Sequence, residues 1–291
     1  MKVIVLGASG LIGHKLFEKL SLRFETYGTL RLKREEYEND FFKDYDNFID
    51  QIDVHDFDNL IKNLNRVNPD VILNCVGITK RKDEINLPLE SIYVNSLFPH
   101  KLLSWAISNN KRLIHFSTDC VFTGKEGNYT ELSLTNAEDV YGRTKALGEV
   151  NYKNGLTIRS SFIGRELSTN SELLEWFLSN TTESINGFKN ALYSGVSTIF
   201  LAKTIGDIVE FYPELYGLRQ LSVKKPISKH DLLIIAKDKF NKRVDIVAEE
   251  EFQIDASLNG DLLRKEISYG NPNWTDMMEE LAADNRYYKS Y

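Results

Sequence analysis

Two side chains with acid–base chemistry stand four residues apart in the sequence YGRTK at 141–145. Positions i and i+4 share one face of a helix, so the Tyr141 phenol and the Lys145 ammonium can reach the same ligand. A tyrosine has a reference pKa near ~10, and a nearby lysine cation lowers that pKa toward the neutral range. The pair predicts a proton donor with a tuning cation. The same spacing also arises by chance, so its place in the fold decides its meaning.

A second polar cluster, in the sequence FSTDCVF at 116–122, follows an apolar run that predicts a strand. Open α/β sheets bind their ligands at the carboxyl ends of their strands, where Ser117, Thr118 and Asp119 would lie. The Thr118 hydroxyl can donate a hydrogen bond to a substrate carbonyl oxygen, with Asp119 beside that substrate. Taken alone, Ser117 and Thr118 are equally typical of strand-end caps. Together with YGRTK they predict one catalytic crevice.

The elements that would carry these residues alternate along the first half of the chain, as in βαβ units that close a parallel sheet. Segments with apolar residues at three- and four-residue spacing predict the intervening helices. The predicted fold class is therefore α/β, with a doubly wound parallel sheet. The expected strands are Lys2–Leu6, Glu25–Thr29, Phe48–Asp53, Asp70–Asn74, Arg112–Phe116 and Leu156–Arg159, and the expected helices lie around Leu11–Leu22, Phe57–Asn65, Ser91–Asn109 and Asp139–Lys153.

A glycine-rich turn joins the first expected strand to the first expected helix. Its sequence GASGLIG has the spacing G-x-x-G-x-x-G, which allows a tight turn, a close approach of backbone N–H groups to a pyrophosphate, and tight packing of helix on sheet. A turn without a ligand is the alternative, but the flanking strand and helix are the context of dinucleotide binding. The fold would then be Rossmann-like, and the expected cofactor contacts are Gly7, Ser9, Gly10, Leu11, Ile12 and Gly13.

The second expected strand ends in YGTLR, without the acidic residue that would bind an adenosine ribose. Arg31, backed by Lys33 and Arg34, would pair with a 2′-phosphate, so NADP(H) is favoured and NAD(H) is the alternative. Two glutamates follow these cations, and a solvated basic loop is the competing interpretation. Asp53 and Val54, after the third strand, are typical of an adenine contact or of a helix cap.

Composition and charge exclude several classes of protein. Thirty-six Lys and Arg against 42 Asp and Glu give a formal charge of -6, which lacks the basic footprint of a nucleic-acid binder. The longest apolar runs fall far short of the ~20 residues that cross a bilayer, and two cysteines form no disulfide framework. We therefore expect a cytoplasmic protein without nucleic-acid or membrane partners. The histidines show no metal-ligand spacing, so no metal is expected.

The chain resembles the extended short-chain dehydrogenase/reductase family, and within it the dTDP-4-dehydrorhamnose reductase-like branch. The resemblance covers nearly the whole chain and is carried by GASGLIG at 7–13, NCVGI at 74–78, SIYVNSLFPHKL at 91–102, FSTDCVFTG at 116–124, YGRTK at 141–145 and IRSSFIGRE at 158–166. It implies that Thr118, Tyr141 and Lys145 form a catalytic triad and that Asn95 supports the site from its helix. It also implies that the cofactor runs along Asn74, Cys75, Val76, Gly77, Ser117, Tyr141 and Lys145. Members of the family act mostly on nucleotide-linked sugars.

One residue departs from the family pattern. Sugar-nucleotide dehydratases of this family carry Glu after the Thr-Asp pair, whereas Cys120 follows it here, so dehydration is disfavoured. The similar reductases carry an aromatic residue at that place, which leaves the substrate open. Catalytic thiol chemistry is the alternative for Cys120, but no histidine partner is identifiable. We expect Cys120 and Cys75 to be small packed residues.

The site residues predict NADPH-dependent reduction of a carbonyl group, and the resemblance implies that the substrate is a 4-keto nucleotide sugar, a 6-deoxy sugar being favoured, in bacterial polysaccharide or O-antigen precursor synthesis. An epimerase that retains NAD(P) and a catalytically silent NADP-binding regulatory subunit are the alternatives. Residues 1–159 with about 196–223 would bind the cofactor, and about 160–195 with 224–291 would form a smaller sugar-nucleotide lobe. Monomer and homodimer both stay open. The expected substrate contacts from this lobe, beside Thr118, are Ser160, Ser161 and Phe162.

Overall fold

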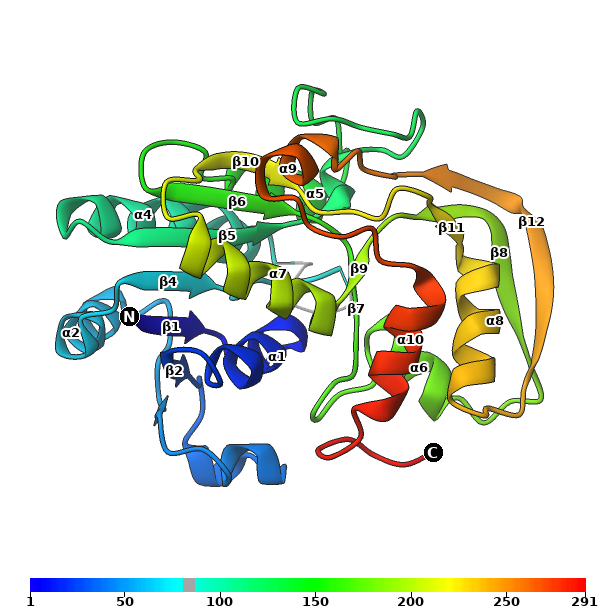
Figure 1. Cartoon of the computed structure of the whole chain (residues 1–291), viewed down its shortest axis with the longest axis horizontal. Helices are drawn as coiled ribbons and strands as arrows, with labels where there is room; N and C mark the ends of the chain where they lie inside the picture. Colours follow the sequence, from blue (N-terminus) through cyan, green and yellow to red (C-terminus); the bar gives the residue numbers. More distant parts are fainter. Residues whose placement is uncertain (81–86) are drawn as a thin grey trace.

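The computed structural model describes residues 1–80 and 87–291. At its centre lies a seven-stranded sheet in the order β10-β6-β5-β4-β1-β2-β3, in which every neighbouring pair is parallel (Figure 1). Parallel strands need crossover connections, which the alternating helices supply. The strands are β1 (Lys2–Leu6), β2 (Glu25–Thr29), β3 (Phe48–Ile49), β4 (Val71–Asn74), β5 (Arg112–Ser117), β6 (Gly155–Arg159) and β10 (Gly217–Gln220).

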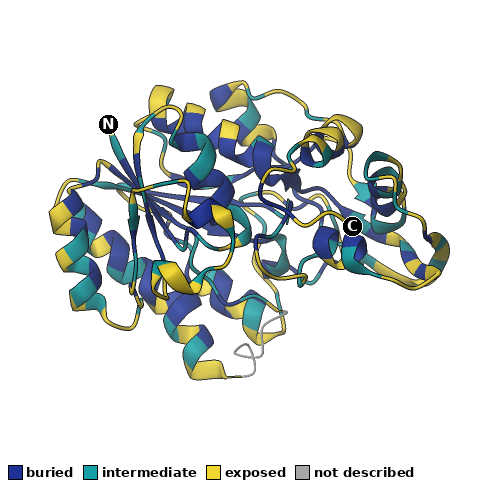
Figure 2. Ribbon diagram, turned by 90° about the horizontal axis from the view of Figure 1, so that it is seen from below, coloured by how far each residue is buried: buried dark blue, intermediate teal, exposed yellow. Residues whose placement is uncertain are grey.

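Alternate residues of β1 pack into opposite layers, which is why its sequence is apolar throughout. Val3 and Val5 join the cluster that contains α1 (Leu11–Leu20) and α7 (Thr198–Phe211). Ile4 and Leu6 join the cluster that contains α2 (Phe57–Val67) and α4 (Phe98–Ser108). Figure 2 shows the buried residues gathered in the sheet and on the helix faces that cover it.

The strand order reverses direction between β1 and β4, because the chain builds outward from β1 to β2 and β3 and then returns to β4. Such a reversal is a topological switch point, and open α/β sheets bind ligands in the crevice that forms there. The doubly wound, Rossmann-like α/β fold predicted from the sequence is confirmed. The glycine-rich turn lies directly at this point, after β1.

A π-helical turn interrupts the helix that was predicted around Ser91–Asn109. The chain passes from α3 (Pro88–Ser91) through the π turn Ile92–Leu97 into α4. Pro99 has no N–H to donate to the carbonyl of Asn95, so the regular hydrogen-bond ladder cannot continue there. The backbone of Gly148 packs directly against this turn. Only glycine fits there, because a Cβ at that position would lie 1.8 Å from the Asn95 carbonyl oxygen.

Two predicted elements are shorter in the structure. The strand expected over Phe48–Asp53 ends at Ile49, and Gln51 has a left-handed φ of 56° that no strand accommodates. The helix expected over Asp139–Lys153 is α5 (Val140–Leu147). It ends where Gly148 meets the π turn, since that close backbone approach admits no further helical turn.

The remaining elements extend beyond the carboxyl edge of the large sheet (Figure 1). A three-stranded sheet joins β11 (Ile227–Ser228), β8 (Ser184–Tyr193) and β12 (Asp245–Asp255), and a two-stranded sheet joins β7 (Phe162–Ile163) to β9 (Val196–Ser197). The division into two lobes stays a prediction. The helices of this part are α6 (Leu173–Ser179), α8 (Lys229–Lys239), α9 (Asp261–Ile267) and α10 (Trp274–Ala283). Among the described residues, no helix has the length and apolar character to cross a membrane.

Candidate active site

The glycine-rich turn has the features that a bound diphosphate requires. Gly7 has a left-handed φ of +78°, and a Cβ on Gly13 would lie 2.1 Å from the Gly7 carbonyl oxygen, so glycine is needed at both positions. Gly10 is the N-cap of α1, and no side chain caps that helix. The N-terminal N–H groups of α1 therefore face outward without a side-chain acceptor, as an anion site requires.

The end of β2 carries the expected cofactor-specificity residue. The Thr29 hydroxyl accepts a hydrogen bond from Gly7 N–H at 3.1 Å, which ties β2 to the glycine turn. Arg31 is exposed, and the described chain gives it no ion pair. Arg34 does not back it as expected, because its guanidinium donates to the carbonyls of Phe42 and Lys43. Arg31 and Lys33 are the cations that stay available there.

Asp53 and Val54 lie in the loop between β3 and α2. The Asp53 carboxylate accepts from His55 N–H at 2.9 Å, and the Val54 carbonyl accepts from the Tyr93 hydroxyl at 3.0 Å. Asp56, and not Asp53, caps α2. Asp53 is exposed and Val54 is half-buried, so both stay accessible for the adenine contact that the sequence predicts.

Asn95 holds the loop that follows β4 against the catalytic helix. Its amide donates to the Ile78 carbonyl at 3.0 Å and accepts from Ile78 N–H at 2.9 Å. It also reaches the Thr144 hydroxyl on α5 at 3.3 Å. Asn74 stabilises the same loop by accepting from Val76 N–H at 3.2 Å. Asn95 is completely buried. Through these hydrogen bonds, Asn95 and Asn74 hold the loop that carries the residues expected along the cofactor, which are Asn74, Cys75, Val76 and Gly77.

Thr118 and Tyr141 meet at the carboxyl end of β5. The Thr118 hydroxyl caps the turn at 119–121 by accepting from Cys120 N–H at 3.1 Å, and it donates to the Asp119 carboxylate at 3.0 Å. Burial raises the pKa of Tyr141, and a hydrogen bond with Thr118 acts in the opposite direction. Asp139 caps α5 by accepting from Gly142 N–H at 2.9 Å, which fixes the turn that carries Tyr141.

Lys145 does not act on Tyr141 as expected from the i, i+4 spacing. Its ammonium donates to the Phe116 carbonyl at 2.7 Å and lies 3.5 Å from His115 Nε2. Burial lowers the pKa of Lys145 to about 8, against the opposing effect of Glu149. The expected lowering of the Tyr141 pKa is therefore not found, because burial and the nearby Cys120 and Asp119 all raise that pKa, and the Thr118 hydrogen bond only partly offsets them.

A buried ion pair that the sequence did not reveal lies beside Ser117, at the end of β5. Arg159 binds Glu149 through both carboxylate oxygens at 2.6 Å, and the Ser117 hydroxyl donates to the same carboxylate at 2.7 Å. The Ser117 hydroxyl therefore donates its proton to Glu149 and does not offer it for the expected cofactor contact. At 3% exposure and with this partner, Arg159 is a buried structural cation. The two residues are ten apart in sequence and share no helix or strand, so no local spacing indicated the pair.

The expected contacts at the end of β6 differ in their availability. Ser160 is buried, and its hydroxyl donates to the carbonyls of Leu221 at 2.6 Å and Ser161 at 3.1 Å. It therefore does not present a hydroxyl beside Thr118 as predicted, because the carbonyl of Leu221, the residue after the edge strand β10, accepts its proton. Ser161 and Phe162 are half-buried and remain candidates for contact with a substrate.

The two cysteines have the chemistry of packed residues. Burial raises the pKa of Cys120 to about 12 and also raises the pKa of Cys75. Both thiols therefore stay protonated and unreactive at neutral pH. In residues 1–80 and 87–291, no group of His, Cys, Asp and Glu side chains is arranged to hold a metal ion.

Comparison with known proteins places this geometry in a family. The model of the family described as RmlD substrate binding domain matches residues 1–170. The chain belongs to this family. A dTDP-4-dehydrorhamnose reductase of Aggregatibacter actinomycetemcomitans is 31% identical over 150 residues, which cover 51% of this chain and 45% of that protein. The matched segments span about half the length of the curated relatives.

Solved structures share the fold along almost the whole chain. A Bacillus anthracis dTDP-4-dehydrorhamnose reductase in complex with NADP superposes with a TM-score of 0.81 at 17% identity, covering 98% of this chain and 99% of that one. A Bacillus anthracis dTDP-glucose 4,6-dehydratase in complex with NAD gives 0.79 at 14% identity, covering 99% and 98%. Reductase and dehydratase thus share this fold, so the fold alone does not decide the reaction.

Proposed function

We propose that this protein is an NADPH-dependent reductase of a 4-keto nucleotide sugar. The observation that carries the proposal is the meeting of the Thr118 and Tyr141 hydroxyls at the carboxyl end of β5, on the sheet edge that also holds the uncapped glycine turn. A hydroxyl pair beside a dinucleotide site is suited to carbonyl reduction, because the forming alkoxide needs both a hydrogen-bond donor and a proton.

The chain's own residues have distinct roles in this proposal. Bound NADPH supplies the hydride. Tyr141 donates the proton to the forming alkoxide, and burial suits this role because the raised pKa keeps the phenol protonated at neutral pH. Thr118, whose hydroxyl donates to Asp119 in this structure, would turn its single proton to the same substrate oxygen. Lys145, whose buried ammonium donates to the Phe116 carbonyl in this structure, would orient the nicotinamide ribose.

The cofactor would be held by the turn at 7–13, by the loop at 74–77 and by Arg31. Arg31 is exposed and has no counter-ion in the described chain, and no acidic residue follows β2 directly. A guanidinium at that place favours the 2′-phosphate of NADP(H), while a ribose hydroxyl would be bound by an acidic residue. NADP(H) is therefore the proposed cofactor, with NAD(H) as the weaker alternative.

The substrate class rests on the family and on Cys120. The relatives' names indicate nucleotide-linked 4-keto-6-deoxy sugars, and we carry that class over as a proposal, with polysaccharide precursor synthesis as its setting. Dehydration of the sugar needs a second carboxylic group next to Asp119. Cys120 supplies a thiol whose pKa is raised to about 12, so it offers no such acid–base group.

The test is to incubate the protein with NADPH and a panel of dTDP-, UDP- and GDP-linked 4-keto sugars while following absorbance of the reduced cofactor. Stoichiometric loss of NADPH with one sugar supports a reductase. An isomerised sugar without net loss of NADPH would indicate an epimerase instead. If the protein binds NADPH but converts none of these sugars, the result would favour the alternative of a catalytically silent NADP-binding regulatory subunit.

A further inference from the structure

Residues 284–291, here called the docking segment, lie against the helix that follows the glycine turn. Asp284 forms an ion pair with Lys15 of α1 at 2.6 Å, and Lys15 is only 1% exposed. Glu18 is the second partner of this lysine. Tyr287 donates its hydroxyl to Asp44 at 2.9 Å, in the segment that follows Arg31. The docking segment therefore touches the helix that follows the glycine turn and the segment that follows Arg31, which adjoin two of the parts that we assign to the cofactor.

Tyr288 connects the docking segment to the glycine turn through His14. His14 Nδ1 lies 2.8 Å from the Gly10 carbonyl oxygen, and His14 Nε2 lies 2.7 Å from the Tyr288 hydroxyl. A carbonyl can only accept, so Nδ1 carries the proton and Nε2 accepts from Tyr288. Burial and the neighbouring Lys15 lower the pKa of His14 to about 3, so the imidazole stays neutral and this arrangement is kept.

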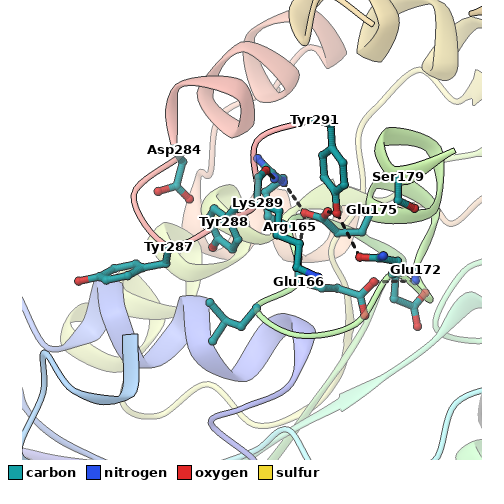
Figure 3. Close-up of polar contacts among 12 residues, drawn as sticks. Arg165, Glu166, Glu172, Glu175, Ser179, Asp284, Tyr287, Tyr288, Lys289 and Tyr291 are labelled. Carbon is teal, nitrogen blue, oxygen red and sulfur yellow. Dashed lines mark hydrogen bonds and ion pairs between the residues drawn. The ribbon is translucent and has the colours of Figure 1, made fainter. Parts of the chain in front are cut away.

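The other side of the docking segment is held by a second buried ion pair (Figure 3). Arg165 binds Glu175 of α6, and both side chains are less than 5% exposed. Arg165 also donates to the Lys289 carbonyl at 2.8 Å and lies 4.8 Å from the centre of the Tyr288 ring. Tyr291 donates to Glu175 at 2.8 Å. Tyr288 is thus clamped between Arg165 and His14.

The hydrogen bond to Gly10 restrains the amide group that a diphosphate would meet. The Gly10 carbonyl and the Leu11 N–H belong to one planar peptide unit, so fixing the carbonyl also fixes the direction of the N–H at the start of α1. Gly10 has no side chain to restrain this peptide, and within residues 1–80 and 87–291 its carbonyl otherwise accepts only from His14 N–H at 3.1 Å. The side chain of His14 is the second restraint.

We propose that Tyr288 and His14 are positioning residues for the dinucleotide, which hold the peptide between Gly10 and Leu11 in the orientation that receives the diphosphate. The inference rests on the proposed function, since it needs a dinucleotide at the glycine turn. It assigns a binding role to a segment 274 residues away in sequence. The docking segment also contacts residues Arg165 and Glu175. It therefore connects the glycine turn of the proposed cofactor site with the part of the chain that is expected to bind the substrate.

The test compares NADPH dissociation constants, measured by fluorescence titration, for Tyr288→Phe and for the matched control Tyr291→Phe. Tyr288→Phe keeps the ring against Arg165 and removes only the donor to His14. We expect NADPH to bind about 5- to 100-fold more weakly, with kcat at saturating NADPH unchanged, because His14 without its donor holds the Gly10 peptide less firmly; the cost of one unpaired buried acceptor sets the upper limit. Tyr291→Phe, whose hydroxyl contacts Glu175 and Asn170, should bind NADPH as the unmodified protein does.

A second variant, His14→Leu, and the double variant complete a thermodynamic cycle. If the two residues act through one hydrogen-bond chain, the double variant binds NADPH no more weakly than the worse single variant. Additive losses, or an unchanged dissociation constant in Tyr288→Phe, would overturn the inference. A fall in melting temperature with unchanged NADPH affinity would also overturn it and show a structural role only. Failure of the unmodified protein to bind NADPH would instead refute the proposed function.

Discussion

Two buried histidines make the stability of this protein depend on pH in a defined window. His14 and His115 are at most 1% exposed. Burial, helped by Lys15, lowers the pKa of His14 to about 3, and burial with Lys145 lowers the pKa of His115 well below its usual value. An unfolded imidazole titrates near ~6.5. Between these values the unfolded chain binds more protons than the folded chain, so stability must fall as the pH is lowered from 6.5.

The loss of stability at pH 5 depends mainly on how far the histidines are protonated in the unfolded state. Folded His14 is still neutral at that pH, whereas an unfolded histidine is almost completely protonated. Linkage then gives a loss of about 2 kcal/mol from His14 between pH 7 and pH 5, and His115 adds a loss of the same sign. Carboxylates contribute mainly below about pH 4.5, outside this window.

Urea unfolding at pH 7, 6 and 5 measures this directly through the free energy of unfolding. His14→Leu should reduce the difference between pH 7 and pH 5 by about 2 kcal/mol, whatever it does to stability at pH 7. The exposed His55, which pairs with Glu90, supplies the control His55→Gln, which should keep the full difference. Equal free energies of unfolding at pH 7 and pH 5 in the unmodified protein would refute the reasoning.

Tyr141→Phe should lower reductase activity by roughly 10²–10⁴-fold while NADPH binds as before in a fluorescence titration; an unchanged rate would show that another group is the acid. Arg31→Ala should weaken NADPH by about 10- to 100-fold and NADH hardly at all, and equal losses would exclude a 2′-phosphate contact. Glu149→Gln leaves buried Arg159 without a counter-charge and should cost about 3–5 kcal/mol of unfolding free energy in urea; a loss below about 1 kcal/mol would contradict this. Hydrogen exchange in 160–190 should slow when the nucleotide sugar is added to the NADP-bound protein, whereas no change would assign substrate binding to the first half alone.

The sequence predicted the parts of the fold that depend on local patterns. The apolar run of β1, the glycine turn and the amphipathic helices are readable because each is built from neighbouring residues. The ends of β3 and α5 were not predictable in this way. The first ends at the left-handed Gln51, and the second ends where Gly148 meets the π turn around Asn95, a contact between distant segments.

In the candidate site, too, features built from neighbouring residues were predictable and contacts between distant segments were not. Spacing and position identified Thr118, Tyr141 and Lys145, and the structure brings the first two together. The direction of the Lys145 amine depends on the Phe116 carbonyl and on burial, which spacing on a helix does not reveal. The Ser160 hydroxyl is taken up by the carbonyl of Leu221, because a later strand packs beside β6. Such long-range contacts leave no local pattern in the sequence.

The most direct test of the proposed function follows NADPH absorbance while the protein is supplied with dTDP-4-keto-6-deoxy sugars, with Tyr141→Phe as the matched inactive control. The proposed function predicts one mole of NADPH oxidised for each mole of sugar reduced at its C4 carbonyl, and at most about 1% of that rate in Tyr141→Phe. Sugar conversion without NADPH oxidation, or an equal rate in Tyr141→Phe, would contradict it.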